Sequence, residues 1–132
     1  MGSTTVLLVD DSATFRNVAR RFLEEHSNDE VRVVGAVARA EDALAEAARL
    51  RPHVVLVDLH LEGLSGLDAI PRLRRLLPGA GLIALSLLDG REYREAVLEA
   101  GGNDFVSKHT MADDLLPAIR RAMAAADSPS GP

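Results

Sequence analysis

Short runs of branched apolar residues in this chain end in charged residues. Residues 6–9 are followed by Asp10 and Asp11, residues 54–57 by Asp58, and residues 105–107 by Lys108. Apolar runs of this length, without polar alternation, indicate strands that are buried on both faces of a parallel sheet. In an open α/β sheet, ligands bind beyond the carboxyl ends of the strands. We therefore expect the charged side chains to meet at one edge of one sheet.

Five strand-like segments alternate with five helix-like segments. The expected strands are residues 5–9, 31–37, 54–58, 82–86 and 104–107. The expected helices, each with an apolar stripe at i, i+3 and i+4, include residues 15–23, 40–50, 67–77, 93–100 and 115–123. Strict alternation implies right-handed crossovers with helices on both faces. The sequence predicts a flavodoxin-like (βα)5 α/β fold, a doubly wound five-stranded parallel sheet of order 2-1-3-4-5.

Helix ends are also marked in the sequence. Three pairs resemble capping boxes and predict helix starts: Ser65 with Asp68, Asp89 with Glu92, and Thr110 with Asp113. At the start of the first helix, Asp11 or Ser12 could serve as the cap. The pair Gly101-Gly102 predicts the end of the fourth helix.

Length and charge restrict the class of protein. With 132 residues the chain can form one domain, for which we expect residues 1–126, with 127–132 a flexible tail or the start of a linker. The net charge of −5 argues against direct nucleic-acid binding by this segment. No apolar run approaches the ~18 residues of a membrane span, and no signal peptide is visible, so we expect a cytoplasmic protein without membrane contact. The absence of cysteine excludes disulfides and thiol chemistry.

The charged cluster indicates a particular chemistry. Alone, each residue has an ordinary explanation: a helix cap for Asp10-Asp11, a turn for Asp58, and a solvated side chain for Lys108. Their joint occurrence at one sheet edge is hard to explain in that way. Three neighbouring carboxylates repel one another and call for a cation, and Mg²⁺ is a hard ion that binds carboxylates together with phosphate oxygens. The cluster therefore predicts a phosphoryl-transfer site.

These residues also show a family resemblance. From residue 5 to residue 124 the chain resembles a response-regulator receiver domain of two-component signalling. The resemblance rests on Asp10-Asp11 with Arg16, on Asp58 within Val-Leu-Val-Asp-Leu-His-Leu-Glu-Gly-Leu-Ser-Gly-Leu, on Ser86 at the end of the next apolar run, and on Phe105 before Lys108. The pattern is similar to the NarL/FixJ-type subgroup, in which a receiver is coupled to a helix-turn-helix DNA-binding domain.

The resemblance implies a role for each residue of the site. Asp58 would be the nucleophile that takes a phosphoryl group from a phosphohistidine of a sensor kinase. Asp11 and Asp58 would ligate Mg²⁺ together with the backbone carbonyl of His60, and Asp10 would act more through water. Lys108 would pair with the phosphoryl oxygens as a mobile point charge.

The resemblance further implies a conformational switch. Ser86 would donate its hydroxyl to the phosphoryl group and pull its loop inward, and Phe105 would change rotamer into the space left behind. This would alter the surface formed by the fourth helix, the fifth strand and the fifth helix, where partners bind and where a homodimer can form. The expected partners are a sensor histidine kinase or a phosphotransfer protein. The domain would be a signalling switch and not a metabolic enzyme, although it catalyses its own phosphotransfer and autodephosphorylation.

Four positions depart from the usual family pattern, one of them Glu62, which stands where a Met-Pro pair usually ends. A proline, frequently after a cis bond, often follows the conserved lysine, whereas His109 follows Lys108 here. A cis bond before a non-proline residue costs about 2.5–4 kcal/mol, and the sequence leaves the state of this bond open. Leu87 replaces a residue that is commonly small, and we expect it to cover the site and limit access. Phe105 lacks the hydroxyl of the more frequent tyrosine, so the switch relies on packing.

Three other classes of protein share the fold or the aspartate nucleophile. A phosphate-independent pseudo-receiver, a binding module on the same fold, remains an alternative because of Leu87 and His109. A haloacid-dehalogenase-like phosphatase needs a second aspartate where His60 stands. A flavodoxin-like FMN carrier needs a phosphate-binding loop rich in Ser, Thr and Gly after the first strand, which this chain lacks.

Overall fold

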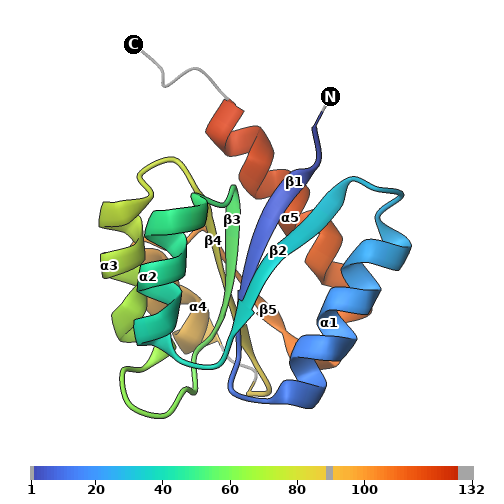
Figure 1. The fold of residues 1–132 in the computed structure, drawn as a ribbon. Coiled ribbons are helices and arrows are strands. Elements are labelled where there is room, and N and C mark those ends of the chain that lie inside the picture. Colours follow the sequence, from blue (N-terminus) through green and yellow to red (C-terminus); the bar gives the residue numbers. More distant parts are fainter. Residues whose placement is uncertain (1, 89–90, 128–132) are drawn as a thin grey trace.

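The computed structural model describes residues 2–88 and 91–127. The elements in this part of the chain follow one another as β1 (Thr4–Val9), α1 (Ala13–His26), β2 (Val31–Val37), α2 (Ala40–Leu50), β3 (Val54–Asp58), α3 (Gly66–Leu76), β4 (Gly81–Ser86), α4 (Arg91–Ala100), β5 (Asp104–Ser107), a 3₁₀ turn (Lys108–Thr110) and α5 (Met111–Asp127) (Figure 1). The strands form one parallel sheet of order β2-β1-β3-β4-β5. The flavodoxin-like doubly wound fold is thus confirmed.

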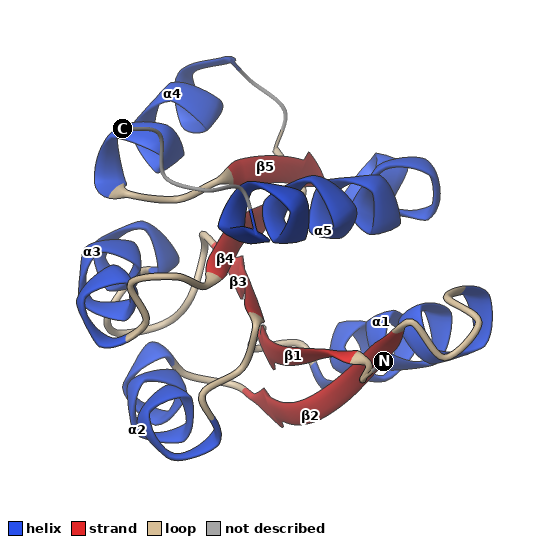
Figure 2. Ribbon diagram, turned by 90° about the horizontal axis from the view of Figure 1, so that it is seen from above, coloured by secondary structure: helices blue, strands red, loops and turns tan. Residues whose placement is uncertain are grey.

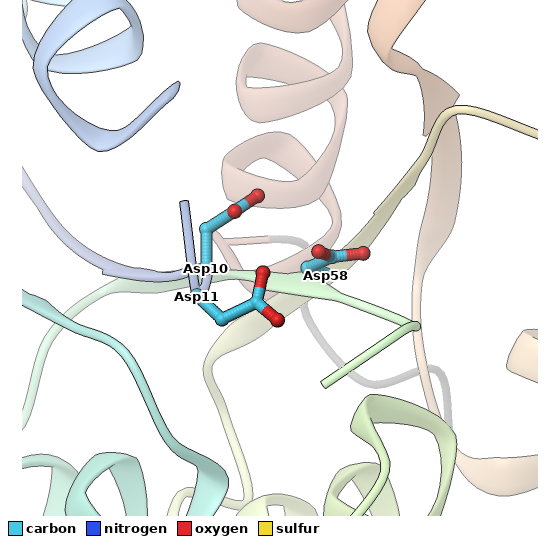
Figure 3. A group of neighbouring side chains, drawn as sticks. All are labelled: Asp10, Asp11 and Asp58. Carbon is cyan, nitrogen blue, oxygen red and sulfur yellow. The ribbon is translucent and has the colours of Figure 1, made fainter. Parts of the chain in front are cut away.

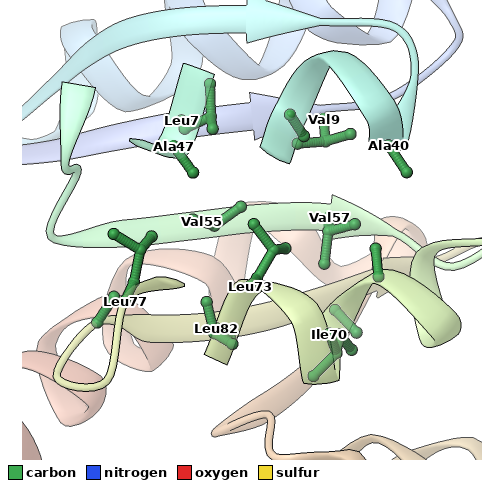
Figure 4. Close-up of a cluster of buried hydrophobic side chains, with 14 of the residues drawn as sticks. Leu7, Val9, Ala40, Ala47, Val55, Val57, Ile70, Leu73, Leu77 and Leu82 are labelled. Carbon is green, nitrogen blue, oxygen red and sulfur yellow. The ribbon is translucent and has the colours of Figure 1, made fainter. Parts of the chain in front are cut away.

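The helices cover both faces of the sheet. Helices α1 and α5 lie on one face, and α2, α3 and α4 lie on the other (Figure 2). Successive strand residues alternate between the two apolar layers: Val6 and Leu8 pack toward α1 and α5, whereas Leu7 and Val9 pack toward α2 and α3 (Figure 4). All four side chains are fully buried. This burial on both faces explains why the strands are continuous apolar runs in the sequence.

Strand ends were predicted more accurately than helix starts. The bounds of β2, β3 and β5 are as predicted, and β1 and β4 each begin slightly earlier, at Thr4 and Gly81. The apolar stripe of the last helix starts only at residue 115, whereas α5 itself begins at Met111. Its first turn includes Asp113 and Asp114, so polar residues there hide the helical apolar stripe.

The predicted helix caps had mixed outcomes. Ser65 Oγ accepts a hydrogen bond of 3.1 Å from the Asp68 N–H, and Gly101, at φ 110°, ends α4 as predicted. At the start of α1 the cap is Ser12, whose Oγ accepts from the Phe15 N–H at 3.1 Å.

The helix start predicted by the Thr110–Asp113 pair is confirmed, because α5 begins at Met111, directly after Thr110. Residues 108–110 form a 3₁₀ turn, and Ser107 caps that turn by accepting a 3.2 Å hydrogen bond from the His109 N–H. The pair Asp89–Glu92 includes a residue outside the described part of the chain. The expected tail is likewise described only as far as Asp127, the last residue of α5. Within the described residues, each helix is too short or too polar to cross a membrane.

One arginine joins three segments at the amino-terminal end of β4. The Arg74 guanidinium donates to the carbonyl oxygens of Leu77, Pro78 and Ala80, to the carbonyl of Gly101 after α4, and to Oδ1 of Asn103. Several of these carbonyls lie at helix ends, where they have no partner within the helix. A cation is also favourable at a helix C-terminus. Arg74 therefore fixes the ends of α3 and α4 against the sheet.

Replacing Arg74 with lysine should lower the free energy of unfolding by about 2 kcal/mol, because an ammonium group cannot reach the acceptors that the planar guanidinium serves together. The exposed neighbour Arg75 provides the control, and Arg75→Lys should change stability by less than about 0.5 kcal/mol. Urea denaturation measures both variants. Equal midpoints for the two would show that the hydrogen bonds of Arg74 add nothing to stability.

Candidate functional site

Three aspartates meet at the carboxyl ends of two adjacent strands. Asp10 and Asp11 directly follow β1, and Asp58 is the last residue of β3, with Val9 paired to Val57 between the strands. One carboxylate oxygen of each aspartate lies within 4.8 Å of the others (Figure 3). The strand ends thus bring together carboxylates that are far apart in the sequence.

The three aspartates differ in environment. Asp10 is fully buried and Asp58 is 5% exposed, whereas Asp11 is exposed. Asp10 Oδ1 accepts a 2.9 Å hydrogen bond from the Ser12 N–H, and Asp58 Oδ1 accepts one of 3.0 Å from the His60 N–H. The backbone on each side therefore fixes one oxygen of each buried carboxylate.

Lys108 lies between the two buried aspartates. Its Nζ is 2.6 Å from Asp10 Oδ2 and 3.3 Å from Asp58 Oδ2, and it sits 4.2 Å from the centroid of the Phe15 ring on α1. Only 8% of the lysine side chain is exposed. The sequence predicted Lys108 at this edge but indicated neither its contact with Phe15 nor its pairing with Asp10. Strand alternation could have indicated this pairing. Every second residue of a strand lies on the same face, and by this spacing Asp10, Asp58 and Lys108 follow the residues that face α1 and α5.

The surroundings of Asp58 disfavour its ionised form. Burial raises the pKa of Asp58 above its ordinary value. The His60 N–H and the Lys108 charge oppose this rise in pKa, and the Asp10 charge adds to it. A single lysine thus compensates two buried carboxylates.

These residues fit a hard divalent cation. Among the described residues, Asp10 Oδ2 is a buried oxygen that accepts no hydrogen bond and is held by the Lys108 ion pair alone. Carboxylate oxygens from Asp10, Asp11 and Asp58 are donors that Mg²⁺ prefers. That the His60 backbone carbonyl would ligate Mg²⁺ stays a prediction, since the contact seen at His60 involves its N–H.

The remaining predicted residues lie around this cluster. Ser86 ends β4, is fully buried, and its Oγ accepts a 3.0 Å hydrogen bond from the Leu88 N–H, which leaves its own hydroxyl proton free to be donated. Leu87 is 59% exposed and so is not part of the core. Phe105 on β5 is half-buried and stacks on Tyr93, an α4 residue that sequence analysis missed. The Lys108–His109 bond, left open by the sequence, is trans.

Comparison with known proteins identifies the family. The family model for the response regulator receiver domain matches residues 6–120. Response regulator GacA of Pseudomonas protegens is 31% identical over 119 residues, which cover 90% of this chain and 55% of that protein. The nitrate/nitrite response regulator protein homolog of Haemophilus influenzae is 32% identical over 116 residues, or 88% of this chain and 55% of that protein.

Solved structures agree with the sequence comparison. A LuxR-family two-component response regulator from Aurantimonas superposes with a TM-score of 0.87 at 27% identity, covering 94% of this chain and 87% of that one. The predicted likeness to NarL/FixJ-type regulators is confirmed by relatives of this kind. The chain spans about half the length of the curated relatives that it matches. The chain belongs to the response-regulator receiver domains of two-component signalling.

Proposed function

We propose that this receiver domain is a phosphorylation-activated switch in which Asp58 accepts a phosphoryl group from a histidine kinase or a phosphotransfer protein. The observation that supports this best is the position of Asp58, a nearly buried carboxylate beside Asp10, Asp11 and Lys108 at one sheet edge. The net charge of −5 disfavours nucleic acid as a direct ligand.

In the proposed reaction an Asp58 carboxylate oxygen attacks the phosphorus of a phosphohistidine. The new O–P bond forms as the P–N bond breaks, and the electron pair stays with the imidazole nitrogen, which then takes a proton. Asp10, Asp11 and Asp58 would hold Mg²⁺, which neutralises charge on the phosphoryl oxygens when bound. Lys108, now paired with Asp10 and Asp58, would transfer one of its contacts to a phosphoryl oxygen.

The consequence for partners would appear at the α4–β5–α5 surface. Ser86 would donate its free hydroxyl proton to the phosphoryl group, and Phe105 would move with it. On this surface the nearly buried Asp104 binds Arg94 of α4 at 3.0 Å and Arg121 of α5 at 2.9 Å, so the two helices are linked through β5. Leu98 of α4 is 49% exposed. We propose this surface as the site of homodimer formation.

The experiment is phosphorylation by a small acyl phosphate in the presence of Mg²⁺. The intact mass of the protein should rise by one phosphoryl group, and Asp58→Asn should abolish the rise because the attacking oxygen is then an amide oxygen. Modification that persists in Asp58→Asn would place the acceptor elsewhere. The pseudo-receiver alternative predicts no modification of the wild type and is not favoured, because the three aspartates, Ser86 and Lys108 are all present at the ends of their strands.

Leu87 should affect how long the phosphoryl group persists. Its exposed side chain follows Ser86 directly, where it can cover the path by which water attacks in line. Leu87→Ala should shorten the lifetime of phosphorylated Asp58 several-fold, a barrier change of about 1 kcal/mol. Loss of phosphate from the isolated phosphoprotein measures this. Leu98→Ala, which removes a leucine of α4 that is 49% exposed, is the control, and equal lifetimes for both variants would contradict a covering role.

A further inference from the structure

Three aromatic side chains connect the acidic site with β5. His60, Tyr93 and Phe105, here called the aromatic row, come from the loop after β3, from α4 and from β5. The His60 and Tyr93 rings meet edge to face with centroids 5.9 Å apart at 78°. The Tyr93 and Phe105 rings lie 6.5 Å apart at 10°. Both arrangements are ones that aromatic pairs prefer.

The first member of the row is bonded to the phosphoryl-acceptor residue. The His60 N–H donates to Asp58 Oδ1 at 3.0 Å. When a carboxylate oxygen becomes part of an acyl phosphate or a metal contact, the charge on this acceptor changes. The hydrogen bond then weakens or realigns, and the backbone that carries the His60 ring responds.

The last member of the row is the residue that the family resemblance assigns to the switch. Phe105 has no hydroxyl, so its position depends on packing, and Tyr93 is the ring that stacks on it. Tyr93 lies near the start of α4 and is half-buried. A shift of the His60 ring therefore reaches both α4 and β5 through one side chain.

We propose that Tyr93 is a positioning residue that transmits the state of Asp58 to α4 and β5 through the aromatic row, along a path separate from the Ser86 hydroxyl. This inference rests on the proposed function, because it requires that Asp58 change its chemical state. Asp58 can shift the conformation of α4 and β5 only through a contact that differs between its unmodified and its modified state. The Asp58–His60 hydrogen bond is that contact.

Amide hydrogen exchange with and without Mg²⁺ and beryllofluoride tests the proposal. In the wild type, exchange in α4 and β5 should slow several-fold on addition. Tyr93→Phe keeps the ring and should retain this response, whereas Tyr93→Leu keeps apolar bulk but loses the stacking and should lose most of it. Glu95→Ala, an exposed change on the same helix, is the control and should respond like the wild type.

A second measurement uses the fluorescence of the wild-type protein. The chain has one tyrosine and no tryptophan, so its emission reports on Tyr93 alone. Emission should change when Mg²⁺ and beryllofluoride are added, and His60→Leu should abolish that change, with bound beryllofluoride checked by fluorine NMR. Both proteins in this measurement contain Tyr93, so it tests the role of the aromatic row even if Tyr93→Leu is poorly folded.

The outcomes separate this inference from the proposed function. The mass increase with a small acyl phosphate should be equal in the wild type and the Tyr93 variants, because the ring contacts given for Tyr93 among the described residues are with His60 and Phe105, not with Asp58. If Tyr93→Leu shows the full exchange response, the aromatic row does not transmit the state of Asp58. The proposal that Asp58 is phosphorylated is unaffected by that result. Absence of a mass increase in the wild type overturns the proposed function, and the role of Tyr93 with it.

Discussion

Replacing Gly66 with alanine should destabilise the protein by about 3 kcal/mol, near the upper end of what an overpacked side chain costs. Gly66 is the buried first residue of α3, and a Cβ added there would lie 1.9 Å from the carbonyl oxygen of Asp58. The obstructing atom is backbone, so no side-chain rotation relieves the clash. The loop between β3 and α3 has to move, and Asp58 moves with it.

Gly79→Ala is the matched control for Gly66→Ala. A Cβ at Gly79 meets no heavy atom within 4 Å, and its φ is not in the left-handed region. Its stability should stay within about 1 kcal/mol of the wild type, and reduced freedom of the unfolded chain can raise it. Urea denaturation compares the two variants. If Gly66→Ala is no less stable than Gly79→Ala, the close approach of α3 to Asp58 is not a constraint on the fold.

Mg²⁺ should raise the free energy of unfolding by about 2.7 kcal/mol when present at 100 times its dissociation constant. The gain arises because the buried Asp10 and Asp58 share one lysine and the exposed Asp11 adds a third carboxylate beside them. Asp11→Ala should remove most of the gain, whereas Glu25→Ala, which removes an exposed carboxylate from the last turn of α1, should preserve it. Thermal melts with and without the ion measure the effect, and equal shifts in both variants would disprove the site.

The gain from Mg²⁺ should also depend on pH in a definite direction. The pKa of Asp58 is raised in the folded state, so the unfolded chain loses this proton first as the pH rises. Without the ion, the contribution of Asp58 to stability is therefore greatest below the ordinary pKa of aspartate and declines as the pH rises through the raised value. Mg²⁺ binds the ionised form, so its stabilising effect should fade as the pH falls through that same range.

The fold and the acidic cluster could be predicted because their signals are local. The inner strands β1, β3 and β4 are largely buried on both faces, so their apolar runs stop where the sheet stops, and the charged residues beyond them share one edge. The fully buried β3 has the predicted bounds for this reason, and the partly buried edge strand β2 also has them. The apolar stripe marks α5 only from residue 115, because its first turn carries Asp113 and Asp114, whereas the Thr110–Asp113 pair marks its start.

Contacts between distant segments could not be predicted in the same way. The position of Lys108 over Phe15 depends on how α1 crosses the sheet. The five hydrogen-bond acceptors of Arg74 lie in the loop before β4 and in the segment between α4 and β5. No sequence pattern around Arg74 indicates them. The stacking of Tyr93 on Phe105 depends on which side of α4 faces the sheet, and apolar periodicity predicts that orientation only coarsely.

The division of the interior into two apolar layers has a consequence for how such a domain can change. The layer under α1 and α5 and the layer under α2, α3 and α4 contact opposite faces of the sheet and, in the described part of the chain, share no buried side chain. Substitutions such as Ile119→Val in one layer and Ile70→Val in the other should therefore have nearly additive costs, within about 0.5 kcal/mol. Each layer can then accumulate substitutions on its own, so the face with α1 can diverge while the face with α4 keeps its packing.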